Sequence, residues 1–241
     1  MGTERRLFAT IGILAWLCMH ATAHAQTTGL VIGPRVNPED RSFEYRFAYD
    51  PGAERFNQRI HYQHSVSDRL RLRATAILND SGASNEQRFR FLQLEAHHQF
   101  VKRTHGWNSA FQYQAQIPDG NDGPGSLRLA WANSFDVGKA WEFRAVGLAT
   151  RAFGDNQPNG FRLETRASAA RRFGRYEIGA QSFNVYGSTA DFPSLSDQVH
   201  SAGPMARSRL GDSFILQLGA LFGLTRGAPD ANLRFLLQYQ L

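Results

Sequence analysis

The sequence predicts an all-β protein, a transmembrane antiparallel up-and-down β-barrel of about twelve strands. Three observations predict it. Apolar and polar residues alternate with a period of two along most of the chain, the alternating runs are roughly 8–13 residues long, and short and long connections alternate between them. A period of two gives each strand one apolar and one polar face, and a tilted strand needs about 9–11 residues to cross a bilayer. Helical spacing fits none of these runs.

The first residues of the chain have the three parts of a secretory signal peptide. Glu4-Arg5-Arg6 form a short charged region, the apolar run Leu7–Met19 follows, and Ala23-His24-Ala25 supplies small residues at the positions that signal peptidase reads. This apolar run is shorter than the roughly 20 residues of a membrane-spanning helix. We therefore expect residues 1–25 to be a signal peptide that is cleaved before Gln26.

The positive charge of the chain is almost all arginine. The 241 residues include 27 Lys and Arg against 21 Asp and Glu, which gives a net charge of +6, and Lys102 and Lys139 are the lysines. A mean hydropathy of -0.41 argues against a membrane protein built of several apolar helices. Basic chains often bind nucleic acid, but here the arginines fall on the polar face of predicted strands, so we expect no nucleic-acid partner.

The sequence offers little for a metal or a cofactor. The single cysteine, Cys18, lies in the predicted signal peptide, which excludes a disulfide framework and a cysteine-based zinc site in the mature chain. Asp119–Gly123 carries oxygen ligands but lacks the glutamate that completes an EF-hand. The chain contains no glycine-rich phosphate loop and no nucleotide-binding fingerprint, so we expect no cofactor and no metal.

The alternating runs define the expected strands. In the clearest run Trp107, Phe111 and Tyr113 alternate with glutamines. Near residue 90, Phe89 runs out of phase with Leu92, which predicts a β-bulge. The expected strands span residues 42–49, 54–66, 69–78, 88–100, 107–117, 126–135, 140–151, 160–172, 175–186, 199–209, 213–224 and 231–241.

The connections between these strands distinguish a membrane barrel from a soluble β-sandwich. A sandwich would need its apolar faces buried against each other and would not need strands this long. Aromatic pairs also flank three short turns, on the apolar phase of their strands, where an interfacial girdle would lie. The pairs are Phe100 and Trp107, Phe135 and Trp141, and Phe173 and Tyr176. Short turns are expected at Ser67-Asp68, Val101–Gly106, Asp136–Lys139, Phe173–Arg175 and Leu210–Asp212, and longer polar loops at Asn79–Gln87, Pro118–Gly125, Ala152–Asn159 and Gly187–Gln198.

The end of the chain resembles that of Gram-negative outer-membrane barrels. The last run alternates Leu233, Phe235, Leu237, Tyr239 and Leu241, and this resembles the C-terminal signal by which such barrels are recognised for insertion, although Leu241 stands where an aromatic residue is more common. With the preceding Leu221–Thr225 and Ala228–Asp230, the tail is similar to those of small porin-like proteobacterial outer-membrane proteins. The resemblance covers residues 42–241 and implies an outer-membrane location, with periplasmic short turns.

The signal peptide and this resemblance together give the expected domain organisation and partners. Residues 1–25 would be the signal peptide, residues 26–41, with Pro34 and Pro38, a periplasmic lead or a lumen plug, and residues 42–241 the barrel. The expected partners are outer-membrane lipids and lipopolysaccharide, the barrel-assembly machinery through the C-terminal strand, and small solutes.

If the apolar phase faces lipid, the polar phase lines a lumen rich in arginine. A twelve-stranded barrel has a backbone radius of roughly 12 Å, and arginine side chains reach roughly 6–7 Å inward, so the free bore is a few ångströms at best. The arginines expected in the lumen, as candidate anion-binding residues, are Arg46, Arg59, Arg71, Arg73, Arg128, Arg144, Arg162, Arg166, Arg207, Arg209 and Arg234, against Glu44, Glu95, Glu142, Glu164 and Glu177.

Three functions fit such a barrel. The arginine surplus favours a passive or substrate-biased channel for small anionic or polar solutes, because guanidinium groups attract and hold oxyanions. The same residues could form Arg–Glu ladders that only brace a non-conducting barrel. An outer-membrane lipid hydrolase is the enzymatic alternative: His64 and His98 fall on the lipid-facing phase, and Ser109 could approach His98 from the next strand. Histidines placed near the interface, where the ring reaches water, are the simpler explanation.

Overall fold

The computed structural model describes residues 28–241 apart from 81–86, 121–122, 155–156 and 158. The predicted signal peptide, residues 1–25, lies outside the described residues, and so do residues 26–27 of the predicted lead. No helix that is long and apolar enough to span a membrane occurs in the described ranges.

Twelve strands make up the described part of the chain, in agreement with the sequence prediction. Their ends lie within two residues of the predicted ends throughout. The strands are β1 (Arg41–Asp50), β2 (Arg55–Ser65), β3 (Leu70–Asp80), β4 (Gln87–Val101), β5 (Trp107–Pro118), β6 (Gly125–Val137), β7 (Trp141–Phe153), β8 (Arg162–Phe173), β9 (Tyr176–Ser188), β10 (Val199–Leu210), β11 (Phe214–Gly223) and β12 (Ala231–Gln240).

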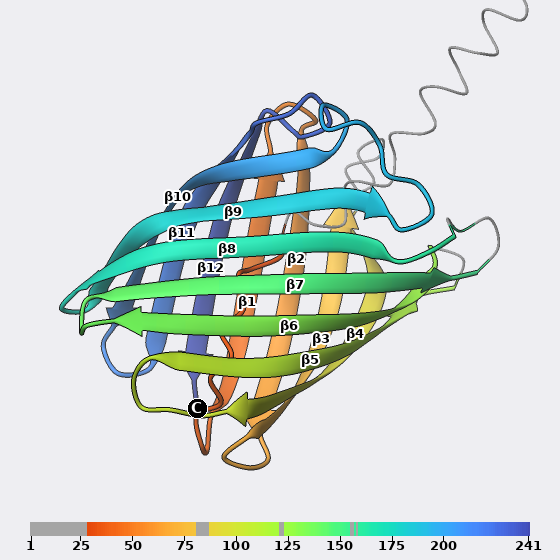
Figure 1. Ribbon diagram of the computed structural model, residues 1–241. Coiled ribbons are helices and arrows are strands. Elements are labelled where there is room, and N and C mark those ends of the chain that lie inside the picture. The colour runs from red at the N-terminus through yellow and green to blue at the C-terminus, as the bar shows by residue number, and fades with distance from the viewer. Residues whose placement is uncertain (1–27, 81–86, 121–122, 155–156, 158) are drawn as a thin grey trace, which may run out of the picture.

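The strands form one closed barrel in which each pairs with its neighbour in sequence (Figure 1). The barrel closes where β1 pairs antiparallel with β12, so that Tyr45 lies opposite Ile60 of β2 on one side and opposite Leu237 on the other. Closure removes the free strand edges, and the backbone N–H and C=O groups of every strand find partners without water. The prediction of an up-and-down antiparallel barrel is therefore confirmed.

The irregularity predicted in the fourth strand is a β-bulge. Ile77 of β3 pairs with Phe91 and the next residue, Leu78, pairs with Phe89, which leaves Arg90 as the extra residue of β4. This extra residue restores the apolar outer phase on both sides of the bulge. Two further register shifts lie at Gln99/Val101 and at Leu163/Glu164. Neither interrupts the alternation of apolar and polar residues in the sequence, so neither was predicted.

The short connections lie at one end of the barrel, and the connections at the other end are longer, except for the short one between β1 and β2. We call the end that carries the C-terminus and the short turns the turn end, and the opposite end the loop end (Figure 1). Gly138 and Gly174 sit in turn-end connections with φ of 61° and 60°, a left-handed conformation that other residues adopt only at a cost. These glycines let the chain reverse between long strands in very few residues.

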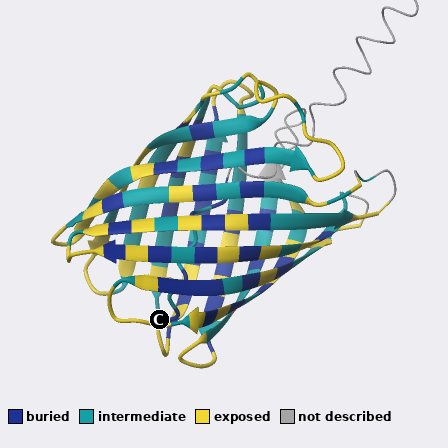
Figure 2. Cartoon of the chain, in the orientation of Figure 1, coloured by how far each residue is buried: buried dark blue, intermediate teal, exposed yellow. Residues whose placement is uncertain are grey.

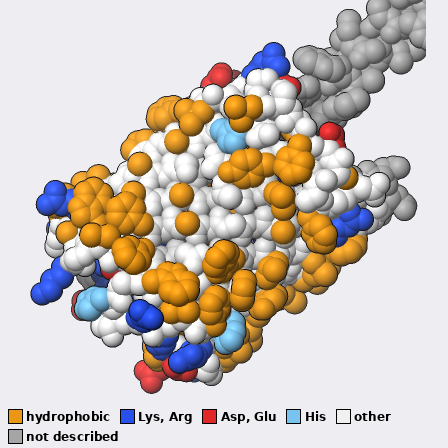
Figure 3. Space-filling model, in the orientation of Figure 1, with side chains coloured by type: hydrophobic (Ala, Val, Ile, Leu, Met, Phe, Trp, Pro, Cys, Tyr) orange, Lys and Arg blue, Asp and Glu red, His pale blue; other side chains and the backbone are white. Residues whose placement is uncertain are grey.

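Inward and outward residues alternate along the strands (Figure 2). Large apolar side chains are exposed on the outside (Figure 3), including the six aromatic residues predicted to flank the short turns. Polar and charged side chains are buried on the inside, so the barrel is inverted relative to a soluble protein. An exposed apolar belt around a closed sheet is the surface that lipid covers.

This two-faced arrangement predicts opposite outcomes for the same substitution at adjacent positions of β8. Ala167 is exposed on the outer face, whereas Ser168 lines internal space. Ala167→Arg should lower the free energy of unfolding by about 2–4 kcal/mol, because the charge enters lipid. Ser168→Arg should lower it less, because this side chain enters a polar cavity, although Arg144 lies directly opposite. Urea unfolding in lipid vesicles measures both, and a larger loss for Ser168→Arg would contradict the assignment of the faces.

Candidate functional site

The arginines that the sequence placed in the lumen lie on the inward phase of their strands. Arg46, Arg59, Arg166 and Arg234 are buried. Arg128 bonds to Thr150 of the neighbouring strand at 2.9 Å. The predicted arginines that line one cavity near the turn end are Arg46, Arg71, Arg73, Arg144, Arg207 and Arg209.

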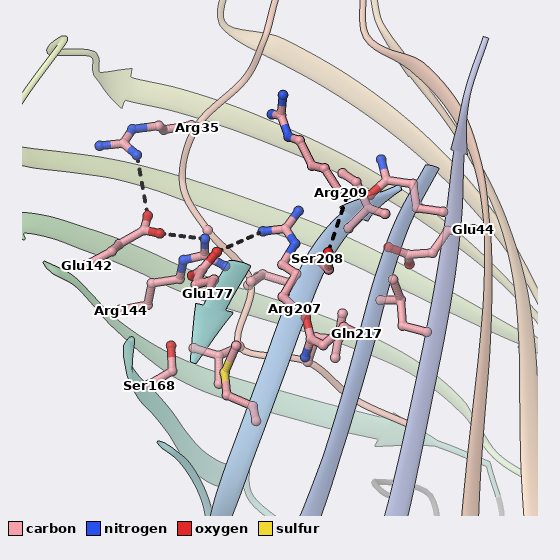
Figure 4. Close-up of a pocket in the computed structure, with 18 of the residues that line it drawn as sticks. Arg35, Glu44, Glu142, Arg144, Ser168, Glu177, Arg207, Ser208, Arg209 and Gln217 are labelled. Carbon is pink, nitrogen blue, oxygen red and sulfur yellow. Dashed lines mark hydrogen bonds and ion pairs between the residues drawn. The ribbon is translucent and has the colours of Figure 1, made fainter. Parts of the chain in front are cut away.

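This cavity has a volume of ≈ 680 Å³ and lies between residues 30–35 of the lead and the barrel wall (Figure 4). The wall is formed by β1–β3 and β7–β12. Nine arginines line the cavity against four carboxylates. The arginines are Arg35, Arg46, Arg71, Arg73, Arg144, Arg172, Arg175, Arg207 and Arg209, and the carboxylates are Asp40, Glu44, Glu142 and Glu177.

The inner glutamates bond to arginines two residues further along the same strand. Residues two apart on a strand point to the same face, so a Glu-x-Arg sequence on the inner phase brings the two groups together. The N–O distances are 2.6 Å for Glu44–Arg46, 2.8 Å for Glu142–Arg144 and 3.1 Å for Glu164–Arg166. Pairs across strands join Arg73 to Glu95 at 3.4 Å and Arg207 to Glu177 at 3.8 Å.

Residues 28–40 run inside the barrel and bond to its wall through backbone atoms. Three wall side chains, from β4 and β8, hold the segment at points several residues apart. Arg166 Nη1 donates to Leu30 O at 3.1 Å, His97 Nε2 donates to Pro34 O at 3.0 Å, and Val36 N donates to Gln99 Oε1 at 2.8 Å. The segment therefore lies against the inner wall rather than outside the barrel.

Arg35 anchors this segment through its side chain. Its guanidinium pairs with Asp136 at the end of β6 and with Glu142 at the start of β7, the second at 3.4 Å. Glu142 also accepts bonds from Arg144 and Arg172, both at 2.8 Å. Figure 4 shows Arg35 reaching Glu142 from the lead. The two carboxylates are almost fully buried, so their pairing with three arginines offsets the cost of removing them from water.

An apolar contact completes the anchoring of the lead. Val31 packs in one buried cluster with Ala130 and Ala132 of β6 and with Val146 and Leu148 of β7. These four wall residues stand on the inner phase, and Phe183 of β9 and Leu221 of β11 belong to the same buried cluster. A small apolar patch inside a polar lumen is stabilised only if another apolar group covers it, and Val31 does so.

Several residues of this site were missed in the sequence. Arg172 and Asp136 continue the inner phase of β8 and β6, and extending the alternation to the strand ends would have found them. The apolar pair Val146 and Leu148 on a lumenal phase was a signal that something packs there. Arg35 lies outside any periodic run, so no pattern pointed to it.

The suggested pairing of Ser109 with His98 is not found. Ser109 lies opposite Val101, whereas His98 lies opposite Phe111. The hydroxyl of Ser109 donates to Asn133 Oδ1 at 2.8 Å and accepts from Trp131 Nε1 at 2.8 Å. The hydrogen bonds of Ser109 thus join β5 to β6 on the outer face, and the geometry gives the hydrolase alternative no support.

The described ranges contain no group of three or more His, Cys, Asp or Glu side chains arranged to hold a metal ion. The acidic loop Asp119–Gly123 includes residues 121–122, which lie outside the described residues.

Comparison with solved structures finds the same fold in porin-like outer-membrane channels. The COG4313 outer membrane channel from Pseudomonas putida F1 is 12% identical with a TM-score of 0.65, over 86% of this chain and 98% of that one. The NanC porin is 9% identical with a TM-score of 0.64, over 83% and 100%.

The KdgM porin is 9% identical with a TM-score of 0.62, over 83% of this chain and 99% of that one. A further KdgM structure is a complex with disordered oligogalacturonate. No family model matches the chain, and no curated protein matches it. The protein has the fold of the porin-like barrels of the Gram-negative outer membrane.

The Arg35 anchor can be tested with a cysteine placed under the lead. We expect Val31→Cys, buried at 8% exposure, to react slowly with a charged thiol reagent. Adding Arg35→Ala should speed the reaction about tenfold, because loss of a partly exposed ion pair worth about 1–2 kcal/mol frees the segment. Arg175→Ala, which removes an arginine bonded to Tyr176 instead, is the control. Equal rates in all three proteins would contradict the anchor.

Proposed function

We propose that the protein is an outer-membrane channel that passes small anionic solutes through an arginine-lined lumen. The observation that carries the proposal is the lining of the turn-end cavity, where nine arginines face four carboxylates. A surplus of fixed positive charge inside low-dielectric walls raises the local concentration of anions and lowers that of cations. Guanidinium groups also offer two parallel donors to carboxylate, phosphate or sulfate.

The comparisons support the channel class and agree with this charge. Three neighbours with TM-scores above 0.6 are porins or channels. One of them, KdgM, is seen with oligogalacturonate, whose sugar units carry carboxylates. At 9–12% identity the likeness covers the fold alone, so the preference of this chain for anions is argued from its own arginines.

The ion pairs leave part of the positive charge of the cavity arginines uncompensated. Glu142 is shared by Arg35, Arg144 and Arg172, and Glu44 bonds to Arg46. The bracing function of the Glu-x-Arg pairs therefore coexists with a positive surplus. A barrel that only needed bracing would be served by equal numbers of both charges.

We propose further that residues 26–41 act as a plug that narrows this path. The described part of the segment bonds to β4 and β8 and packs on β6 and β7, and it leaves the cavity that β1–β3 and β7–β12 line. Anions would then pass between the lead and the wall that carries Arg207 and Arg209.

The partners follow from the two ends and the outer surface of the barrel. We propose that lipids and lipopolysaccharide cover the exposed apolar belt. The alternating outer residues of β12, from Leu233 to Leu241, would be presented to the barrel-assembly machinery during insertion.

Selectivity tests the proposed channel directly. In planar bilayers under a salt gradient, we expect the wild-type reversal potential to indicate anion preference. Arg207→Gln with Arg209→Gln should lower the anion-to-cation permeability ratio a few-fold, because two cavity charges are lost. Arg226→Gln, whose side chain is 77% exposed in the last loop, should leave the ratio unchanged. Absence of conductance, or cation preference in the wild type, would overturn the proposal.

Removal of the lead tests the plug separately. Deleting residues 28–38 should raise the single-channel conductance at least twofold, since the path widens while the strands remain intact. The same salt and voltage are used for the full mature chain, and folding is checked by the different gel migration of boiled and unboiled samples. Unchanged conductance in a folded deletion variant would show that the lead does not restrict the path.

A further inference from the structure

One lumenal arginine stands apart from the ion pairs. Arg234 on β12 is only 8% exposed, and neither Nη1 nor Nη2 has a hydrogen-bond partner within the described part of the chain. Its guanidinium lies over the ring of Phe183, whose centroid is 4.4 Å from Cζ. A buried cation without an anion or an acceptor is costly, so its retention needs an explanation.

The surroundings of Arg234 add positive charge rather than compensate it. Arg166, Arg46 and Arg59 are the charged groups whose fields act on it. Arg166 also lies over Phe183, with its Cζ 5.5 Å from the ring centroid. The nearest glutamates of these strands, Glu44 and Glu164, are already bonded to Arg46 and Arg166.

A second, small cavity of ≈ 10 Å³ lies beside Arg234 and Arg46. Gly219, directly opposite Arg234 on β11, is one of its lining residues, and a Cβ there would lie 2.7 Å from Gln181 Nε2. The other side of the cavity is formed by Thr28 and Leu30 of the lead. This space holds about one water molecule while the lead is in place.

The lead also bonds to Arg166, the arginine that shares the ring of Phe183 with Arg234. Arg166 Nη1 donates to Leu30 O, and Gly29 packs so closely that a Cβ there would lie 2.7 Å from the same nitrogen. The lead thus places a neutral carbonyl oxygen where an oxyanion could bind Arg166. Movement of residues 28–30 would free Arg166 and open the space beside Arg234.

We infer that Arg234, Arg166 and Arg46 form a binding site for one oxyanion group of a solute, a carboxylate, phosphate or sulfate, and that residues 28–30 cover this site. The inference rests on the proposed anion channel and locates the point where a permeating anion pauses. An oxyanion there accepts from the orphaned Nη atoms of Arg234 and replaces Leu30 O on Arg166. Ligand and lead therefore compete for the same arginines.

The test uses the purified barrel in detergent and follows conversion of the unboiled to the boiled gel form with temperature. Sodium sulfate, sodium phosphate and sodium acetate are added separately, with sodium chloride at matched ionic strength as reference. For the wild type, we expect the midpoint temperature of this conversion to rise to a plateau as the concentration of at least one oxyanion increases. With chloride the midpoint temperature should rise less and without a plateau. Comparison of the three salts identifies the preferred group.

Substitution of Arg234 should distinguish oxyanion binding at this site from a general effect of the positive charge in the lumen. Arg234→Gln should raise the midpoint in salt-poor buffer by a few degrees, because an uncompensated charge is removed, and should abolish the saturable oxyanion effect. Arg234→Lys keeps the charge without the two-nitrogen fork and should weaken apparent binding several-fold. Arg226→Gln in the exposed loop should behave as the wild type.

The outcomes distinguish failure of the proposed binding site from failure of the proposed channel. Equal stabilisation of the wild type and both Arg234 variants, or no saturable effect in the wild type, would overturn the site even if bilayers show an anion-selective current. Saturable stabilisation that depends on Arg234, without any conductance, would support the site and refute the channel. If Arg234→Gln does not fold, the comparison of the wild type with Arg234→Lys decides.

Discussion

The antiparallel pairing of β1 with β12 is the interaction on which the other features of this molecule depend. A sheet in a bilayer must pair every backbone N–H and C=O group within itself, and only a closed sheet does so. Closure also fixes which side chains face lipid and which face the lumen, since residues alternate along each strand. The inner space is narrow, so a charged side chain within it is stabilised by an opposite charge beside it. The Glu-x-Arg pairs and the anchored lead follow from this enclosure, and the arginine surplus makes the enclosed space positive.

The fold could be predicted from the sequence because it depends on a local, repeated signal. Each strand needs an apolar outer phase, and the run Trp107–Ile117 shows this phase without knowledge of any other strand. Even the bulge at Arg90 left a visible break, because Phe89 and Leu92 had to keep the same face. The register shift at Leu163/Glu164 left no visible break in the sequence pattern, since it lies at the loop end, where the outer phase is weakly apolar.

The candidate site was only partly predictable, because its decisive contacts join distant segments. The inward phase of the lumenal arginines and the Glu-x-Arg pairs along one strand follow from alternation, but the partners on other strands and in the lead do not. Arg35 reaches Asp136 and Glu142 across roughly a hundred residues, and the lead that carries it has no periodicity. Val146 and Leu148 could have indicated a contact inside the lumen, but not that Val31 would supply it. The isolation of Arg234 depends on which glutamates the other arginines occupy, which only the three-dimensional arrangement reveals.

Arginine would have two functions in the proposed channel: it braces the wall where a glutamate is near, and it would attract anions where none is. The most direct measurement of the second function is the rate at which liposomes that contain the barrel take up labelled galacturonate or labelled galactose, each at tracer concentration in the same sodium chloride solution, so that chloride exchange balances the charge. The two sugars have nearly the same size and differ by one carboxylate. We expect faster entry of galacturonate, and equal or slower entry of the acid would contradict an anion-attracting lumen.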